Sequence, residues 1–340
     1  MAAKPLHSGP LLVTIPSARP ANYIIIHAQF EADLPIASLS KRSGFAPHQL
    51  HYSLGRLRDE GVLRRWAFIN PYALGYEQYR FFFSLAPETR ASRERLISTV
   101  KKHGQVVWFA ELGGNFQYAM TIYTRSTFEF TNFIEMLGQQ FGGLFLKKAF
   151  MVDAGFYVFR KKYLAPTQSA KQDEFISVTP QARQRDLDDL DYTILSALTN
   201  HEYDSHREIA QRLGIPRSTV DLRLKKLENS KVILRYVYLI SAAKLGMQVY
   251  RLLIYMRGME KKVKERMLLF CREQAHVVNL SFCIAPWDYE VTVELERPEN
   301  ISAVLEQLYS NFRQVISDVE VLPVFKQEIS RDLKLTPARM

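Results

Sequence analysis

Apolar residues recur at helical spacing, at positions i, i+4 and i+7, in two separate stretches of the chain. They are Leu50, Leu54 and Leu57 in the first stretch and Val220, Leu224 and Leu227 in the second. This spacing puts the three side chains on one face of a helix, which we expect to be buried. Gly44 and Gly214 lie shortly before these helices, where a glycine suits the tight turn between two helices. Each stretch therefore predicts a helix-turn-helix.

The two stretches are copies of one unit, because residues 170 positions apart correspond. The further matches are Val62 with Val232, Arg65 with Arg235 and, after one inserted residue, Leu74-Gly75 with Leu245-Gly246 and Tyr118 with Tyr289. A register that persists over so long a stretch indicates an internal duplication.

After each helix-turn-helix, apolar runs and amphipathic stretches predict the series strand, helix, strand, strand, helix, strand. In the first copy we expect these elements at residues 78–85, 88–103, 106–112, 116–124, 128–141 and 145–159. In the second copy we expect them at residues 249–256, 260–274, 277–284, 287–295, 298–311 and 315–325. This βαββαβ order is the ferredoxin-like split motif, so the predicted fold class is α+β.

The same pattern predicts the domain organisation. A flexible arm with four prolines (1–20) precedes the first helix-turn-helix domain (21–70) and the first ferredoxin-like domain (71–164). A polar, proline-containing linker (165–186) leads to the second helix-turn-helix domain (187–240), the second ferredoxin-like domain (241–330) and a tail (331–340).

Charge favours a polyanionic partner. The 340 residues carry a formal net charge of +10. Locally, eight Lys and Arg face three Asp and Glu between Arg207 and Arg235, and six face two between Leu39 and Trp66. A single basic face of this kind is also typical of a solvent-exposed helix in a three-helix unit that binds other proteins and not DNA. Two copies, each with a basic excess, favour double-stranded DNA.

The outward faces of the two third helices supply the candidate DNA contacts. In the second copy they are Arg217, Ser218, Thr219, Asp221, Arg223 and Lys225; in the first they are His48, Gln49, His51, Tyr52 and Arg56. Phosphate contacts are expected from Arg64, Arg65, Lys226 and Arg235. The two faces differ in sequence, which predicts two unlike half-sites.

Other kinds of chemistry have little support in the sequence. Cys271 and Cys283 form no CxxC pattern, which argues against a disulfide framework and a thiolate zinc site. His48 and His51 have helical spacing, but no third metal ligand is suggested nearby. No apolar stretch approaches the roughly 18 residues of a membrane span, and the N-terminus is a poor signal peptide. We therefore expect a cytoplasmic protein without metal, cofactor or membrane.

The second copy resembles the leucine-responsive/asparagine-operon regulator (Lrp/AsnC) family. The resemblance is carried by residues 187–191 (LDDLD), 212–214 (RLG), 232–233 (VI) and 245–246 (LG). It implies a transcriptional regulator with winged helix-turn-helix heads and effector-type ferredoxin-like domains. Members usually consist of one unit and pair through the latter domains, so this chain is expected to be a tandem fusion that forms an intrachain pseudo-dimer and self-associates through these domains.

The resemblance also implies a small, amino-acid-like effector. In the family, a turn with the pattern Gly-x-Tyr/Phe-Asp-Tyr borders the ligand site. The residues that match it here are Gly113, Gly114 and Phe116 in the first copy and Asp288 in the second, where Ala285-Pro286 replaces the glycine. The first copy is the better candidate, and the alternative is that the turn only closes a β-hairpin.

Two further functions remain open. Siroheme decarboxylases resemble these regulators, and a histidine precedes a Tyr-Asn pair on their equivalent hairpin. Gly114 and Ala285 occupy that position here, so we expect no enzyme activity. An effector-sensing protein that has lost DNA binding is the other alternative. The sequence names neither the operator nor the direction of regulation.

Overall fold

Each copy begins with a three-helix head. The computed structural model describes residues 20–86, 89–165, 174–180, 184–200, 203, 205–258, 260–330 and 333–337, so the predicted arm (1–20) lies almost wholly outside the described residues. The helices of the first head are α1 (Pro20–Ala28), α2 (Ile36–Ser43) and α3 (Pro47–Asp59). Those of the second are α6 (Asp189–Asn200), α7 (His206–Leu213) and α8 (Arg217–Asn229). The apolar stripes of α3 and α8 are buried, as predicted.

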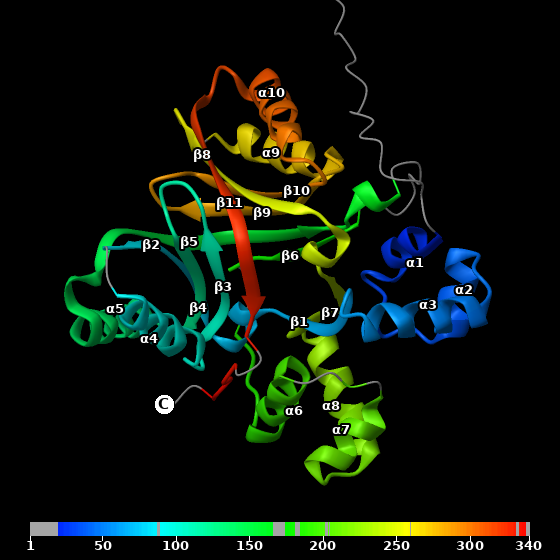
Figure 1. Cartoon of the computed structure of the whole chain (residues 1–340). Coiled ribbons are helices and arrows are strands. Elements are labelled where there is room, and N and C mark those ends of the chain that lie inside the picture. Colours follow the sequence, from blue (N-terminus) through cyan, green and yellow to red (C-terminus); the bar gives the residue numbers. More distant parts are fainter. Residues whose placement is uncertain are drawn as a thin grey trace, which may run out of the picture.

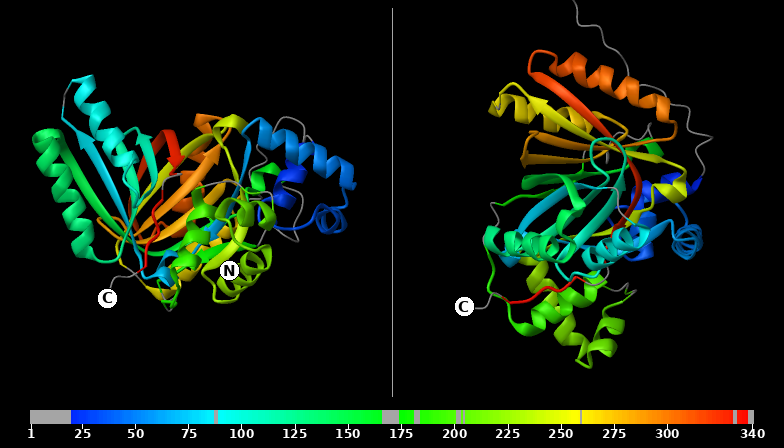
Figure 2. Two further views of the ribbon diagram at one scale, coloured as in Figure 1. Left: turned by 90° about the horizontal axis from the view of Figure 1, so that it is seen from below. Right: turned by 60° about the vertical axis from the view of Figure 1, so that its left-hand side comes forward.

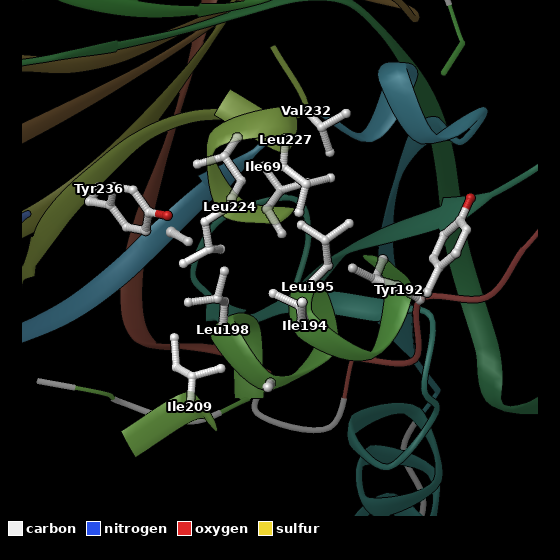
Figure 3. Close-up of a cluster of buried hydrophobic side chains, with 14 of the residues drawn as sticks. Ile69, Tyr192, Ile194, Leu195, Leu198, Ile209, Leu224, Leu227, Val232 and Tyr236 are labelled. Carbon is white, nitrogen blue, oxygen red and sulfur yellow. The ribbon is translucent and has the colours of Figure 1, made fainter. Parts of the chain in front are cut away.

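A two-stranded ribbon joins the heads. The strand after each head, β1 (Leu63–Ile69) or β7 (Ile233–Ile240), pairs with its counterpart antiparallel. Trp66 lies opposite Val237 and Ala67 opposite Tyr236, so equivalent residues are exchanged about a pseudo-two-fold axis. The ribbon also interlocks the heads: Figure 3 shows Ile69 of the first copy within the apolar core of the second head.

Both ferredoxin-like domains have the predicted βαββαβ order. The first consists of β2 (Glu77–Leu85), α4 (Arg90–Lys101), β3 (Val106–Leu112), β4 (Tyr118–Thr124), α5 (Thr127–Phe141) and β5 (Phe145–Phe159). The second consists of β8 (Gln248–Met256), α9 (Lys261–Glu273), β9 (Val277–Ile284), β10 (Tyr289–Leu295), α10 (Ile301–Phe312) and β11 (Ile316–Ile329). Short 3-10 helices lie at Pro71–Leu74, Gly142–Leu144, Lys162–Leu164, Ala243–Leu245 and Pro298–Asn300.

The two sheets close into one barrel. The strand order is β2-β4-β3-β11-β8-β10-β9-β5, and β5 pairs again with β2. The long strands β5 and β11 make the crossings, because β5 also pairs with β9 and β11 also pairs with β3. The pair α4–α5 and the pair α9–α10 lie on opposite sides of the barrel (Figures 1 and 2). The predicted intrachain pseudo-dimer is therefore confirmed.

Two segments predicted as a linker and a tail contribute to the fold. Within the predicted linker (165–186), strand β6 (Phe175–Val178) pairs with the end of β5, which would otherwise present an open edge. In the predicted tail (331–340), Leu333 and Leu335 are buried, and Leu333 exchanges two hydrogen bonds with Asn200. Both segments are held by pairing with residues distant in the sequence, which local composition does not reveal.

Candidate nucleic-acid interface

A left-handed glycine positions each third helix. Gly214 has φ +67° and its N–H donates to the carbonyls of Ala210 and Gln211, which ends α7. Gly44 has φ +78° and its N–H donates to the carbonyl of Ser40, which ends α2. Residues with a Cβ are strained in this conformation, so glycine is the residue that allows α3 and α8 to start at this angle.

The outward face of α8 combines cations, a hydroxyl and one large apolar side chain. Arg217, Ser218, Leu222 and Lys225 are exposed, whereas Thr219 is half-buried. Within the part of the chain that the structure describes, Lys225 forms no ion pair. A cation and hydroxyls at the start of a protruding helix suit contacts to phosphates and base edges.

Asp221 is held by its neighbours. Its carboxylate lies 2.6 Å from Nδ1 of His206 and 3.6 Å from Nε of Arg217. The predicted base contact at Asp221 is therefore also an internal tie, which fixes the first turn of α8 against α7 and orients Arg217.

Two other predicted contacts fasten α8 to the start of α6. The carboxylate of Asp191 is fully buried and accepts from Arg223 at 3.1 Å and from Lys226 at 2.7 Å. Arg223 also pairs with Asp188, and the pKa of Asp188 is lowered by the backbone N–H of Asp191 and by Arg223. Because Asp191 is buried, these ion pairs serve the packing of the head before any ligand is present.

The first head presents a different surface. His48, His51 and Tyr52 are exposed on α3. Nε of Arg56 lies 3.4 Å from Oε1 of Glu60, one helical turn later. Gln49 is exposed, but its Oε1 accepts from the N–H of Ala46 at 3.1 Å and so caps the helix. Reading adenine needs that same oxygen, so this contact requires the cap to open.

The cations of the ribbon have partners inside the molecule. Arg65 donates to the carbonyl of Tyr203 at 2.8 Å, and its counterpart Arg235 pairs with Glu174. The guanidinium of Arg64 lies 5.0 Å from the ring centroid of Trp66. The phosphate contacts predicted for these three arginines therefore compete with existing contacts.

One outward side chain had no predicted role. Leu222 is 69% exposed, and Tyr52, which lies 170 positions earlier, has the same exposed fraction. The spacing of the repeat was the available signal, because it places a large side chain at the same point of both third helices.

The four predicted effector residues do not face one open site. The N–H of Gly113 donates to the carbonyl of Pro323 at 2.8 Å, and a Cβ on Gly113 would lie 2.8 Å from the ring of Phe325. Gly114 has φ +89°, and a Cβ on it would lie 3.0 Å from a methyl carbon of Leu322. Both glycines accommodate β11 of the other copy.

Phe116 and Asp288 are also engaged in the fold. Phe116 is buried against Phe82 and Trp287 at the end of the barrel. The carboxylate of Asp288 accepts from the N–H of Met256 at 2.7 Å and so ties the turn between β9 and β10 to the end of β8. These contacts favour the alternative in which the turns are structural, and an effector at these residues remains a prediction.

Metal and thiol chemistry find no support in the described residues. No group of three His, Cys, Asp or Glu side chains within them has the arrangement of a metal site. Cys271 and Cys283 are buried and unpaired with each other, and burial raises the pKa of Cys271 to about 12. In the same part of the chain, no helix has the length and apolar character that a membrane span requires.

Comparisons with known proteins find a DNA-binding fold in the second head. Residues 187–233 match the family described as winged helix-turn-helix DNA-binding. HTH-type transcriptional regulator FL11 of Pyrococcus furiosus is 30% identical over 116 residues, which are 34% of this chain and 76% of the relative. The uncharacterized HTH-type transcriptional regulator PF1734 of the same organism is 29% identical over 125 residues, 37% of this chain and 83% of its own.

A solved structure shares the whole architecture. The siroheme decarboxylase NirDL covers 93% of both chains with a TM-score of 0.60, and at 13% identity this likeness shows the fold alone. The regulator FL11 is 30% identical and is matched over 76% of its length. This chain contains the unit of head and ferredoxin-like domain twice. The chain belongs to the Lrp/AsnC family of HTH-type transcriptional regulators.

Proposed function

We propose that this protein is a sequence-specific regulator of transcription that binds double-stranded DNA with both heads of one chain. The observation that carries the proposal is the pair of exposed third helices, α3 and α8, on heads locked together by the β1–β7 ribbon. Both heads lie on the ribbon side of the barrel (Figure 1). A pseudo-two-fold pair of such helices fits successive major-groove segments of a duplex.

The two heads contact the duplex with different side chains. In the second head, Arg217 and Lys225 contact phosphates, and Ser218 and Thr219 lie where base edges pass. In the first head, His48, His51 and Tyr52 take the corresponding places, and Arg56 contacts a phosphate after releasing Glu60. The ties of Arg223, Lys226, Arg65 and Arg235 hold the heads in position for these contacts.

A decarboxylase function has weaker support. The relatives that match by sequence are named as transcriptional regulators, and the likeness to NirDL is one of fold. Gly114 and Ala285, at the hairpin position where a decarboxylase would need its histidine, instead leave room for β11 or lie in a tight turn. Specific binding to duplex DNA, measured by titration of labelled fragments against random competitor, tests the regulator; equal affinity for all sequences at every salt concentration speaks against it.

Leu222 and Tyr52 are predicted to read thymine methyl groups. A large apolar side chain exposed on a polar helix gains most when it is buried against another apolar group, and the C5 methyl is the apolar feature of the major groove. We expect Leu222→Ala to lose the preference for thymine at one position of one half-site, by about 1 kcal/mol or five- to tenfold. Tyr52→Ala is expected to do so in the other half-site.

Selection of bound sequences from a random pool measures both effects. Asn229→Ala, at an exposed position near the end of α8 to which no DNA contact is assigned, is the matched control for a change elsewhere on the helix. If both variants kept the wild-type sequence preference at every position while duplex affinity stayed intact, the assignment of Leu222 and Tyr52 would be refuted.

A further inference from the structure

A cavity of about 1220 Å³ separates the ribbon from the barrel. Trp66 and Tyr238 of the ribbon line one side, and Arg80, Trp108 and Arg251 of the barrel line the other. Neither Gly113 nor Asp288 lines this cavity, so it is distinct from the two turns considered above as an effector site. Its volume exceeds the roughly 300–1,000 Å³ of common small-molecule sites, so a ligand with a sizeable flat body has room there.

Arg251, which lines this cavity, has one buried donor without a partner. Its side chain is 8% exposed and pairs with Glu290 through Nη1, but its Nε has no hydrogen-bond partner among the described residues. The guanidinium carbon lies 4.1 Å from the ring centroid of Trp108. A buried N–H without a partner is costly, so an acceptor that reaches the Arg251 guanidinium after a small movement of this side chain gains a charge-assisted hydrogen bond.

The equivalent arginine of the first copy is satisfied. Arg80 lies 171 positions earlier, donates from Nε to Thr121 at 3.2 Å and pairs with Glu290 and with Asp153. The two copies carry the same residues here, since each arginine lies opposite a threonine, Thr121 or Thr292. Their contacts differ: each nitrogen of the Arg80 guanidinium has a partner, whereas Nε of Arg251 has none among the described residues. This difference in contacts makes the two sides of the cavity unequal.

The lining is cationic beyond Arg251. Two acidic residues line the cavity, and both are neutralised by a lysine. Glu294 pairs with Lys161, and Oε1 of Glu328 lies 3.0 Å from Nζ of Lys101. Lys102 and Lys326 are exposed on the lining and form no ion pair within the described parts of the chain. The field of these lysines attracts an anion towards the cavity.

We propose that this cavity binds an aromatic oxyanion, with the anionic group at the guanidinium of Arg251 and the ring system against Trp108 and Trp66. The ligand bridges the barrel and the ribbon, and the ribbon carries both heads. Its binding therefore biases the relative position of α3 and α8, which makes the cavity the effector site of the regulator. This last step rests on the proposed DNA-binding function, whereas the site itself does not.

Fluorescence titration of the full chain with 8-anilinonaphthalene-1-sulfonate, an aromatic sulfonate, tests the site. One saturable site per chain is expected. The exposed pair Lys102→Glu and Lys326→Glu should weaken it roughly tenfold or more, by reversing charge at the lining. The pair Lys148→Glu and Lys262→Glu makes the same charge change at exposed positions outside the lining and should leave the affinity unchanged.

Arg251→Met, which keeps the length of the side chain, should also weaken binding at unchanged far-ultraviolet circular dichroism. Absence of saturable binding, or equal weakening by both lysine pairs, overturns the site. Labelled duplex is then titrated with and without the sulfonate, and a severalfold change in Kd is expected. An unchanged Kd overturns the effector role, whereas failure to bind duplex in either condition refutes the proposed function and leaves the site standing.

Discussion

Replacing both Arg217 and Lys225 by alanine is expected to weaken binding to duplex DNA at least about tenfold at low salt, across all sequences. The same change should reduce the slope of log K against log salt concentration by about two, since each phosphate contact contributes close to one. Both side chains are exposed at the outward face of α8, and neither has a buried internal partner. Fluorescence anisotropy of a labelled duplex at several salt concentrations measures both quantities.

The matched control replaces Lys148 and Lys262, two exposed lysines of the ferredoxin-like domains, by alanine. This pair removes the same net charge from the chain but lies away from the third helices. If both double variants lowered affinity and slope equally, the effect would come from total charge, and the assignment of α8 as the DNA-contacting helix would be wrong.

Glu290→Gln is expected to destabilise the fold by about 3–5 kcal/mol, the usual cost of removing one partner from a buried ion pair. The Glu290 carboxylate is fully buried between Arg80 and Arg251, one arginine from each copy. The variant leaves two buried guanidinium groups with only Asp153 as a counter-charge. Urea denaturation followed by circular dichroism measures the change, and Glu306→Gln on the exposed face of α10 is the control.

The effect of Glu290 should depend on pH in one direction. Burial alone raises the pKa of Glu290, but Arg80 and Arg251 outweigh it and bring the pKa below its ordinary value. A carboxyl whose pKa is lower in the folded state stabilises the fold above its unfolded pKa, about 4.3, and loses this contribution as pH falls further. The difference between wild type and variant should therefore be full at pH 7 and shrink below about pH 4; a difference that stays constant from pH 7 to pH 3 would show that the carboxylate charge is not the cause.

Local signals were sufficient for much of the fold. The apolar stripe Val220, Leu224 and Leu227 predicted a helix with one buried face, and these three residues are the buried residues of α8. Strand β9 was also predicted at its observed bounds, as a short apolar run between polar turns. The duplication extended these signals to the first copy, where Gly44 and the leucines of α3 repeat them.

Long-range pairing was beyond such signals. Strand β11 was expected to end at Phe325 but runs to Ile329, because its last residues pair with β3 of the other copy. Local signals also did not predict that Arg65 and Arg235 contact groups inside the protein. Their partners, Tyr203 and Glu174, lie far away in the sequence. A basic residue near a helix-turn-helix therefore indicates a phosphate contact only when no acidic or carbonyl partner folds onto it.

The most direct test of the central claim is the selection of genomic fragments that bind the full chain, followed by base-resolution footprinting. Two heads locked by one ribbon, with unlike reading helices, predict a motif of two different half-sites whose centres lie about one helical turn, or 10–10.5 base pairs, apart. Enrichment of no motif, or of one half-site protected by a single head, would contradict the account.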